Sequence, residues 1–404
     1  MNRRFFIKIL IALGLFPKKF VEAHMPQDGY EPLTSVKFLR QIITKDSRSS
    51  RMIMWQSYEE ENFLVEWRLI GEETAHFSEV RRKDFIYSCA LENLKPESLY
   101  NFRIVADKRA TSWQNLRTAG DGAFQMLIFA DSQCEHYEVW QRTADTANET
   151  FPDAEIFTVI GDLVDNGEAD YQWRAWHLAS ANLLAERIFA PVMGNHECYG
   201  VNWLNFLPTG YLNQFALPDN DSKKFGGYFY SFDYGAAHFF ILNTQFDELD
   251  DLKPGLQAAQ EYWFRRDAAQ VNRPWKIVFM HKDIYNYARD KFDDDIADKF
   301  LELFDELEID LVFTGHLHTY RNRGKIFARK KSARGTIYIL CGRSGDQKYV
   351  EPPSKIDDVT FKNLDKEPES FILLNVCADT INLLSRTVSG EVLDRFTIRK
   401  ENLK

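Results

Sequence analysis

Residues 156–165 read IFTVIGDLVD, an apolar and β-branched run that ends on a glycine and two carboxylates. Such a run, bounded by a turn residue, predicts a buried strand over 156–160 that is followed by Gly161. Residues 189–197, FAPVMGNHE, repeat the arrangement, with an amide, an imidazole and a carboxylate after the glycine. The chain therefore places polar side chains at the ends of two buried strands.

Three further blocks have the same form, an apolar run followed by polar donors: 124–130 with Asp131, 276–280 with His281, and 311–313 with Gly315, His316 and His318. Parallel strands bring their carboxyl ends to one edge of a sheet, so these scattered donors are expected to meet. His316 and His318 lie two residues apart and project to the same side of an extended segment. Carboxylate, amide and imidazole donors together predict a two-metal site for Fe, Mn or Zn.

Between these strands lie amphipathic segments that predict helices over 140–150, 171–185, 255–269 and 294–307, so this part of the chain is expected to be α/β. Residues 33–118 instead carry short β-branched and aromatic runs between charged turns, which predicts an all-β domain. Leu94-Lys95-Pro96 followed by Tyr100 is typical of a tyrosine corner. Residues 119–122, AGDG, are the expected linker.

The chain has 404 residues and a formal net charge of -10, which fits two domains and disfavours nucleic acid or an anionic membrane as a partner. Its five cysteines are too few and too scattered to hold the fold together by disulfides. Cys134 and Cys198 follow two of the polar blocks closely, so they are either neighbours able to form a disulfide or separate buried thiols.

Residues 1–24 predict an export signal, with Arg3-Arg4 before the apolar stretch 9–16 and a small-residue cleavage site before His24. The arginine pair is similar to a twin-arginine signal, although an ordinary secretory signal and an uncleaved membrane anchor are both alternatives. A periplasmic, cell-envelope or extracellular location is expected.

The five polar blocks, in this order, resemble the calcineurin-like metallophosphoesterase superfamily. Together with the N-terminal all-β segment, the chain is most similar to purple acid phosphatase-like members that carry a fibronectin type III-like domain. The resemblance implies an immunoglobulin-like or fibronectin III-like β-sandwich over 30–119 and a four-layer α/β/β/α catalytic domain over 122–400. It also implies that two metal ions activate a hydroxide that hydrolyses a phosphate ester.

By the same resemblance, Asp162 bridges both metals and serves catalysis. Asp131 and His318 complete the first metal site, and Asn195, His281 and His316 complete the second. His196 contacts the substrate phosphate or its leaving oxygen as a general acid. Asp165 and Glu197 support the site from outside, Asp165 by fixing its turn and Glu197 by orienting a loop or a ligand imidazole.

Two positions depart from the family pattern. Gln133 stands where most of the superfamily has a histidine ligand, and its amide either binds the first metal weakly or points elsewhere. Asp165 stands where purple acid phosphatases carry the tyrosine that binds ferric iron, so no tyrosinate colour is expected.

Three residues are candidates for the border of the substrate cleft: Tyr199, Tyr285 and Arg343. An arginine there would suit phosphate recognition. A small phosphorylated molecule is the expected substrate. Hydrolysis of phosphate monoesters is the expected activity, and phosphodiesterase or nucleotidase activity at the same site is the alternative. A different reading is an envelope-binding protein whose metal chemistry is weakened by Gln133. The sequence does not indicate the oligomeric state.

Overall fold

The structure is a computed structural model that describes residues 29–286, 291–292, 294–348 and 368–400. The signal segment predicted over 1–24 lies outside these residues. Within the part of the chain that is described, no helix is long and apolar enough to cross a membrane.

Two large sheets form the centre of the α/β region. The first contains the parallel strands β11 (Phe124–Phe129), β12 (Ile156–Val159) and β13 (Ile188–Phe189), extended antiparallel by β23 (Ser370–Val376), β24 (Thr380–Thr387) and β25 (Val392–Arg399). The second has the order β14 (Tyr230–Tyr234), β15 (Ala237–Leu242), β16 (Trp275–Met280), β19 (Leu311–Thr314), β22 (Thr336–Cys341), β20 (Tyr320–Phe327) and β21 (Lys330–Lys331). In both sheets the strands that precede the polar blocks run parallel.

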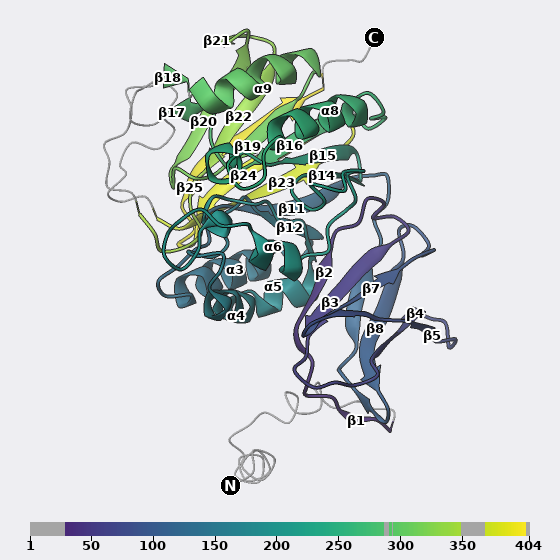
Figure 1. Cartoon of the computed structure of the whole chain (residues 1–404). Coiled ribbons are helices and arrows are strands. Elements are labelled where there is room, and N and C mark those ends of the chain that lie inside the picture. The colour runs from purple at the N-terminus through teal and green to yellow at the C-terminus, as the bar shows by residue number, and fades with distance from the viewer. Residues whose placement is uncertain (1–28, 287–290, 293, 349–367, 401–404) are drawn as a thin grey trace.

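The two sheets pack face to face, with helices on their outer faces (Figure 1). Alternate residues of a strand point to opposite faces, so Met126 and Ile128 belong to the core between the sheets and Leu127 and Phe129 to the outer one. Phe129 contacts Trp140 of α3 (Glu138–Thr150), with ring centroids 5.1 Å apart. On the other side lie α7 (Phe246–Leu249), α8 (Leu256–Ala268) and α9 (Asp294–Glu306). The predicted α/β/β/α layering is confirmed.

The helix predicted over 171–185 is in fact two, α4 (Asp170–Ala179) and α5 (Ala181–Glu186). Ser180 separates them, because its hydroxyl donates to the Trp176 carbonyl at 2.7 Å and accepts the Trp140 indole N–H at 2.8 Å. A serine that bonds locally competes with a continuous helix. The break folds α5 back toward β2 (Lys37–Ile42).

The N-terminal region is a β-sandwich, as predicted. One sheet contains β1 (Glu31–Pro32), β9 (Arg109–Ala110), β8 (Leu99–Ala106), β4 (Leu64–Leu69), β5 (His76–Ser78) and β10 (Gln114–Arg117). The facing strands are β2, β3 (Arg51–Gln56), β7 (Ile86–Leu91) and β6 (Arg81–Lys83). The tyrosine corner is present, since the Tyr100 hydroxyl accepts the Lys95 N–H at 2.7 Å. The likeness of this sandwich to a fibronectin type III domain in particular stays a prediction.

The sandwich and the α/β region share a sheet. Strand β2 pairs in parallel with β13, with Ile188 opposite Gln41 and Phe189 opposite Ile42. The strands from β25 to β6 thus form one ten-stranded sheet, which contains strands from both sides of the expected linker. The bounds 30–119 and 122–400 remain predictions, and the two regions are joined by backbone pairing as well as by the chain between them.

Candidate metal centre

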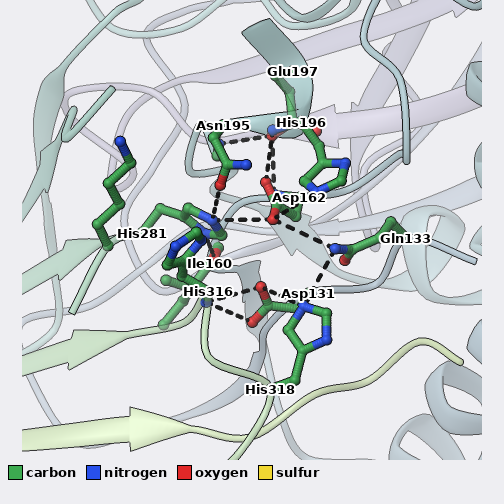
Figure 2. A network of polar contacts seen from close by, with 12 residues as sticks. Asp131, Gln133, Ile160, Asp162, Asn195, His196, Glu197, His281, His316 and His318 are labelled. Atoms are coloured by element: carbon green, nitrogen blue, oxygen red, sulfur yellow. Dashed lines mark hydrogen bonds and ion pairs between the residues drawn. The ribbon is translucent and has the colours of Figure 1, made fainter. Parts of the chain in front are cut away.

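The predicted donors converge at the carboxyl ends of the central strands. Asp131, Asp162 and Asn195 come from the loops after β11, β12 and β13, while His281 and His316 follow β16 and β19 of the facing sheet. Figure 2 shows Asp162 in the middle of this group, with Asn195, His196, Gln133 and His281 around it. The expected meeting of the five polar blocks is therefore observed.

Four of these residues adopt left-handed backbone conformations, with φ of 51° at Asp131, 51° at Asp162, 75° at His316 and 52° at His318. Residues other than glycine seldom occupy this region, and such strain gathers at functional sites. Close packing adds a demand for glycine beside Asp162: a Cβ atom on Gly194 would lie 2.1 Å from Asp162 Oδ1. The backbone of these loops thus adopts unfavourable conformations and close contacts at the residues that carry the donors.

Two groups of donors could each hold a metal ion, and both contain Asp162. Asp131, Asp162 and His318 form one, and Asp162, His281 and His316 form the other, with the donor atoms of each group within 4.8 Å of one another. His281 Nε2 lies 3.1 Å from Asp162 Oδ2 and 2.9 Å from Asn195 Oδ1, and His318 Nε2 lies 3.4 Å from Asp131 Oδ1. Ligands about 2.1 Å from a shared ion are separated by about 3.0–3.4 Å, so the spacing fits.

The imidazoles are turned to offer lone pairs to the centre. His281 Nδ1 lies 2.8 Å from the Ile160 carbonyl and His318 Nδ1 lies 2.9 Å from the Gln347 carbonyl, so each Nδ1–H donates to a backbone carbonyl and each Nε2 faces the centre. His316 Nδ1 is buried and has no hydrogen-bond partner in the described part of the chain. Burial and the neighbouring His281 hold the pKa of His316 well below its usual value, so the ring is neutral, as a ligand must be.

Asp162 is fully buried and ionised. Burial opposes its charge, but His281 and His196 outweigh that effect and hold the pKa of Asp162 well below its usual range. Its Oδ1 also accepts the His196 backbone N–H at 3.0 Å. A buried carboxylate with two differently placed oxygens suits a bridging role between two cations.

His196 borders this group and is held by Asp165. The His196 Nδ1–H donates to the Asp165 backbone carbonyl at 2.7 Å, and the Asp165 carboxylate lies 3.4 Å from the same nitrogen. His196 Nε2 therefore faces the centre, 3.9 Å from Asp162 Oδ2. Burial lowers the pKa of His196, but the Asp162 carboxylate and the Asp165 carbonyl outweigh burial and raise it. Asp165 thus positions His196, a contact that the sequence did not reveal.

Glu197 joins the two loops that carry Asp162 and Asn195. Its buried carboxylate accepts the N–H groups of Gly194 at 2.7 Å, Leu163 at 2.8 Å and Asp162 at 2.9 Å. Burial and the Asp162 charge raise the pKa of Glu197 to about 7, while these donors act in the opposite direction. Of the two roles expected for Glu197, the contacts are those of the loop-orienting one.

A second chain of contacts behind Asn195 was missed. The Asn195 amide lies 3.4 Å from the Tyr199 hydroxyl, which lies 3.5 Å from Glu248, and Glu248 pairs with Lys282 at 2.9 Å. In the sequence, the position of Lys282 directly after His281 is the feature that could have indicated a role for Lys282 near the centre. The distance along the chain between Lys282 and Glu248 hid the pairing.

Tyr285 and Arg343 lie in settings that differ from an open cleft wall. Tyr285 packs between the Arg323 guanidinium, 4.4 Å from its ring centre, and the Phe292 ring at 4.5 Å. Arg343 is 1% exposed, pairs with Glu369 at 3.1 Å and donates to the Gly345 carbonyl. The guanidinium of Arg343 thus stabilises its own loop.

The possible disulfide between Cys134 and Cys198 is not formed. Both are buried free thiols, as are Cys89 and Cys341. Cys134 Sγ instead accepts the Asp346 N–H at 3.3 Å. The reading as separate thiols is confirmed.

Comparisons with known proteins agree with this geometry. Residues 124–320 match the Calcineurin-like phosphoesterase family. The chain is 29% identical over 210 residues to Purple acid phosphatase 23 of Arabidopsis thaliana, covering 50% of this chain and 42% of that protein. It is 23% identical over 303 residues to Probable purple acid phosphatase 20 of the same plant, covering 70% and 66%. The chain thus spans less than two thirds of either relative.

Solved structures share the fold over nearly the whole chain. The purple acid phosphatase PPD1 from yellow lupin (Lupinus luteus) superposes with a TM-score of 0.77 at 18% identity, covering 90% of this chain and 74% of that one. PhoD superposes with a TM-score of 0.64 at 12% identity, covering 91% and 90%. Residues 124–320 therefore match the Calcineurin-like phosphoesterase family, and the chain is similar in sequence to purple acid phosphatases and shares the fold of PPD1 and PhoD.

Proposed function

We propose that this chain is an exported phosphoesterase that binds two transition-metal ions and hydrolyses small phosphate monoesters. The observation that carries the proposal is the pair of donor groups that share the buried Asp162. Metal ions bound there supply a nucleophile from water and neutralise phosphate oxygens. Export is inferred from residues 1–24 alone.

The residues of the chain have separate tasks in this proposal. Asp131, Asp162 and His318 hold the first ion, and Asn195, His281 and His316 hold the second. His196, whose Nδ1–H is committed to the Asp165 carbonyl, keeps its exchangeable proton on Nε2. That proton faces the centre, where it can be given to the leaving oxygen of the substrate.

Activity against paired substrates tests the proposal. The purified chain, supplied with Mn, Fe or Zn, is expected to contain about two metal equivalents and to hydrolyse an aryl phosphate faster than the matching diester. Faster turnover of the diester would favour the phosphodiesterase alternative. No bound metal and no hydrolysis after supplementation would favour the envelope-binding alternative.

We further propose that Gln133 completes the first metal site. Gln133 is 1% exposed, and its Nε2 lies 3.4 Å from Asp162 Oδ2 and 3.3 Å from His318 Nε2. Its Oε1 is buried without a partner in the described part of the chain. The two ends of an amide have the same shape, so a half-turn of the amide would bring the oxygen to this donor group.

Gln133→His is then expected to tighten binding at the first site roughly tenfold, about 1.4 kcal/mol, because imidazole is a stronger ligand than an amide oxygen. Titration calorimetry with Zn or Mn measures this change independently of activity. Gln133→Ala, the paired control, should weaken the same site. Equal affinities in all three proteins would mean that residue 133 does not ligate.

A further inference from the structure

A short turn beside His196 presents aromatic side chains at the rim of the metal centre. Tyr199 pairs with Asn205 across the turn, and the Gly200 N–H donates to the Leu204 carbonyl at 2.9 Å. The Val201 N–H donates to the Glu168 carboxylate at 2.7 Å, which ties the turn to the loop that follows Asp162. The turn is therefore held from both sides.

Trp203, at the tip of this turn, is unusual in two ways. It is 56% exposed, and its φ of 62° lies in the left-handed region. An apolar side chain that stays exposed contributes little to the stability of the fold, and bulky residues are disfavoured at positive φ. Folding therefore does not explain why a tryptophan stands here, and a strained residue beside a site points to function.

The rings of Trp203, Tyr199 and His196 form one cluster. The Trp203 ring stands edge-on to His196, with centroids 6.0 Å apart, and lies 6.2 Å from Tyr199. Tyr199 is 5.5 Å from His196. Since His196 Nε2 lies 3.9 Å from Asp162, a group attached to phosphate at the metal centre would reach Trp203 by extending past His196.

We propose that Trp203, with Tyr199, is a specificity-determining subsite that stacks on a planar ring of the leaving group. This inference rests on the proposed function. It narrows the proposed substrates to phosphate monoesters whose leaving group carries an aromatic ring, as in a nucleotide or an aryl phosphate. Stacking on an exposed indole is tolerant of ring identity, because every base has a π face. The subsite thus selects for a ring without selecting among bases.

Two other exposed residues of the turn, Val201 and Leu204, are each 65% exposed. With Trp203 they give the turn an apolar tip, so the rival explanation for the exposed Trp203 is that the tip binds another protein. The ring contacts of Trp203 with His196 favour the substrate role, because Val201 and Leu204 have no part in the aromatic cluster. Leu204→Ala is therefore a matched control for Trp203→Ala.

Adenosine 5′-monophosphate and ribose 5-phosphate differ only in the base, so their hydrolysis by the metal-loaded full chain isolates the ring contact. Trp203→Ala is expected to lower kcat/KM for the nucleotide roughly tenfold or more through KM, and to leave ribose 5-phosphate within about twofold. Trp203→Phe should restore part of the loss. Leu204→Ala should change neither substrate.

An equal loss on both substrates, or no loss on either, would overturn the proposal. Should the wild type hydrolyse neither compound, calorimetric binding of adenosine 5′-monophosphate separates the two hypotheses. Binding that Trp203→Ala abolishes would support the ring subsite although the proposed activity had failed. Binding that Trp203→Ala leaves unchanged, or no binding at all, would reject it.

Discussion

Asp162→Asn is expected to release both metal ions and to lower kcat/KM by about 10³-fold or more. Asp162 is the one residue common to both donor groups, and it is fully buried. Asparagine has nearly the same shape but no charge and only one oxygen, so it cannot neutralise or bridge two cations. Metal analysis by atomic emission, together with steady-state kinetics, measures both effects.

His196→Ala is the control for this prediction. It removes a ring that faces the centre but is absent from both donor groups. We expect the metals to stay bound while the rate falls by about 10²–10⁴-fold, the usual loss on removing a general acid. Full activity with two metals in Asp162→Asn would show that the assigned centre is wrong.

Glu197→Ala is expected to lower the free energy of unfolding by about 4 kcal/mol. The substitution leaves the buried N–H groups of Asp162, Leu163 and Gly194 without their acceptor, and each unsatisfied buried donor costs about 1–3 kcal/mol. Urea unfolding followed by circular dichroism, with chelator present so that metal loss does not contribute, measures the change.

Glu168→Ala is the matched comparison, because Glu168 is an exposed glutamate that also accepts a backbone N–H, from Val201. We expect it to cost less than about 1 kcal/mol, since water can replace the lost acceptor. Similar losses in the two variants would argue against a special role for the buried carboxylate.

The layers and the donor set could be predicted because each signal was local. An apolar run followed by a glycine and a polar residue marks a strand and its end, as at 156–165. The edge of the sheet at which the donors meet could be predicted because parallel strands bring their carboxyl ends to the same edge. The same locality explains the tyrosine corner at Tyr100, whose partner lies five residues away.

What escaped prediction depends on contacts between distant segments. The acceptor of the His196 ring N–H is a backbone carbonyl 31 residues earlier, and a carbonyl leaves no mark in a sequence. The pairing of Arg343 with Glu369 and the pairing of β2 with β13 are set by tertiary packing in the same way. Strain was also hidden, because nothing in the composition distinguishes the left-handed Asp162 from an ordinary aspartate.

The pairing of β2 with β13 has a practical consequence for anyone who dissects this protein. A truncated chain that begins near residue 122 would lack β2, and the N–H and C=O groups of Ile188 and Phe189 on that side would lose their partners. Bare strand edges recruit other chains and promote aggregation. The fragment that carries every donor of the metal centre would thus be expected to precipitate, and insolubility on truncation would say nothing about catalysis.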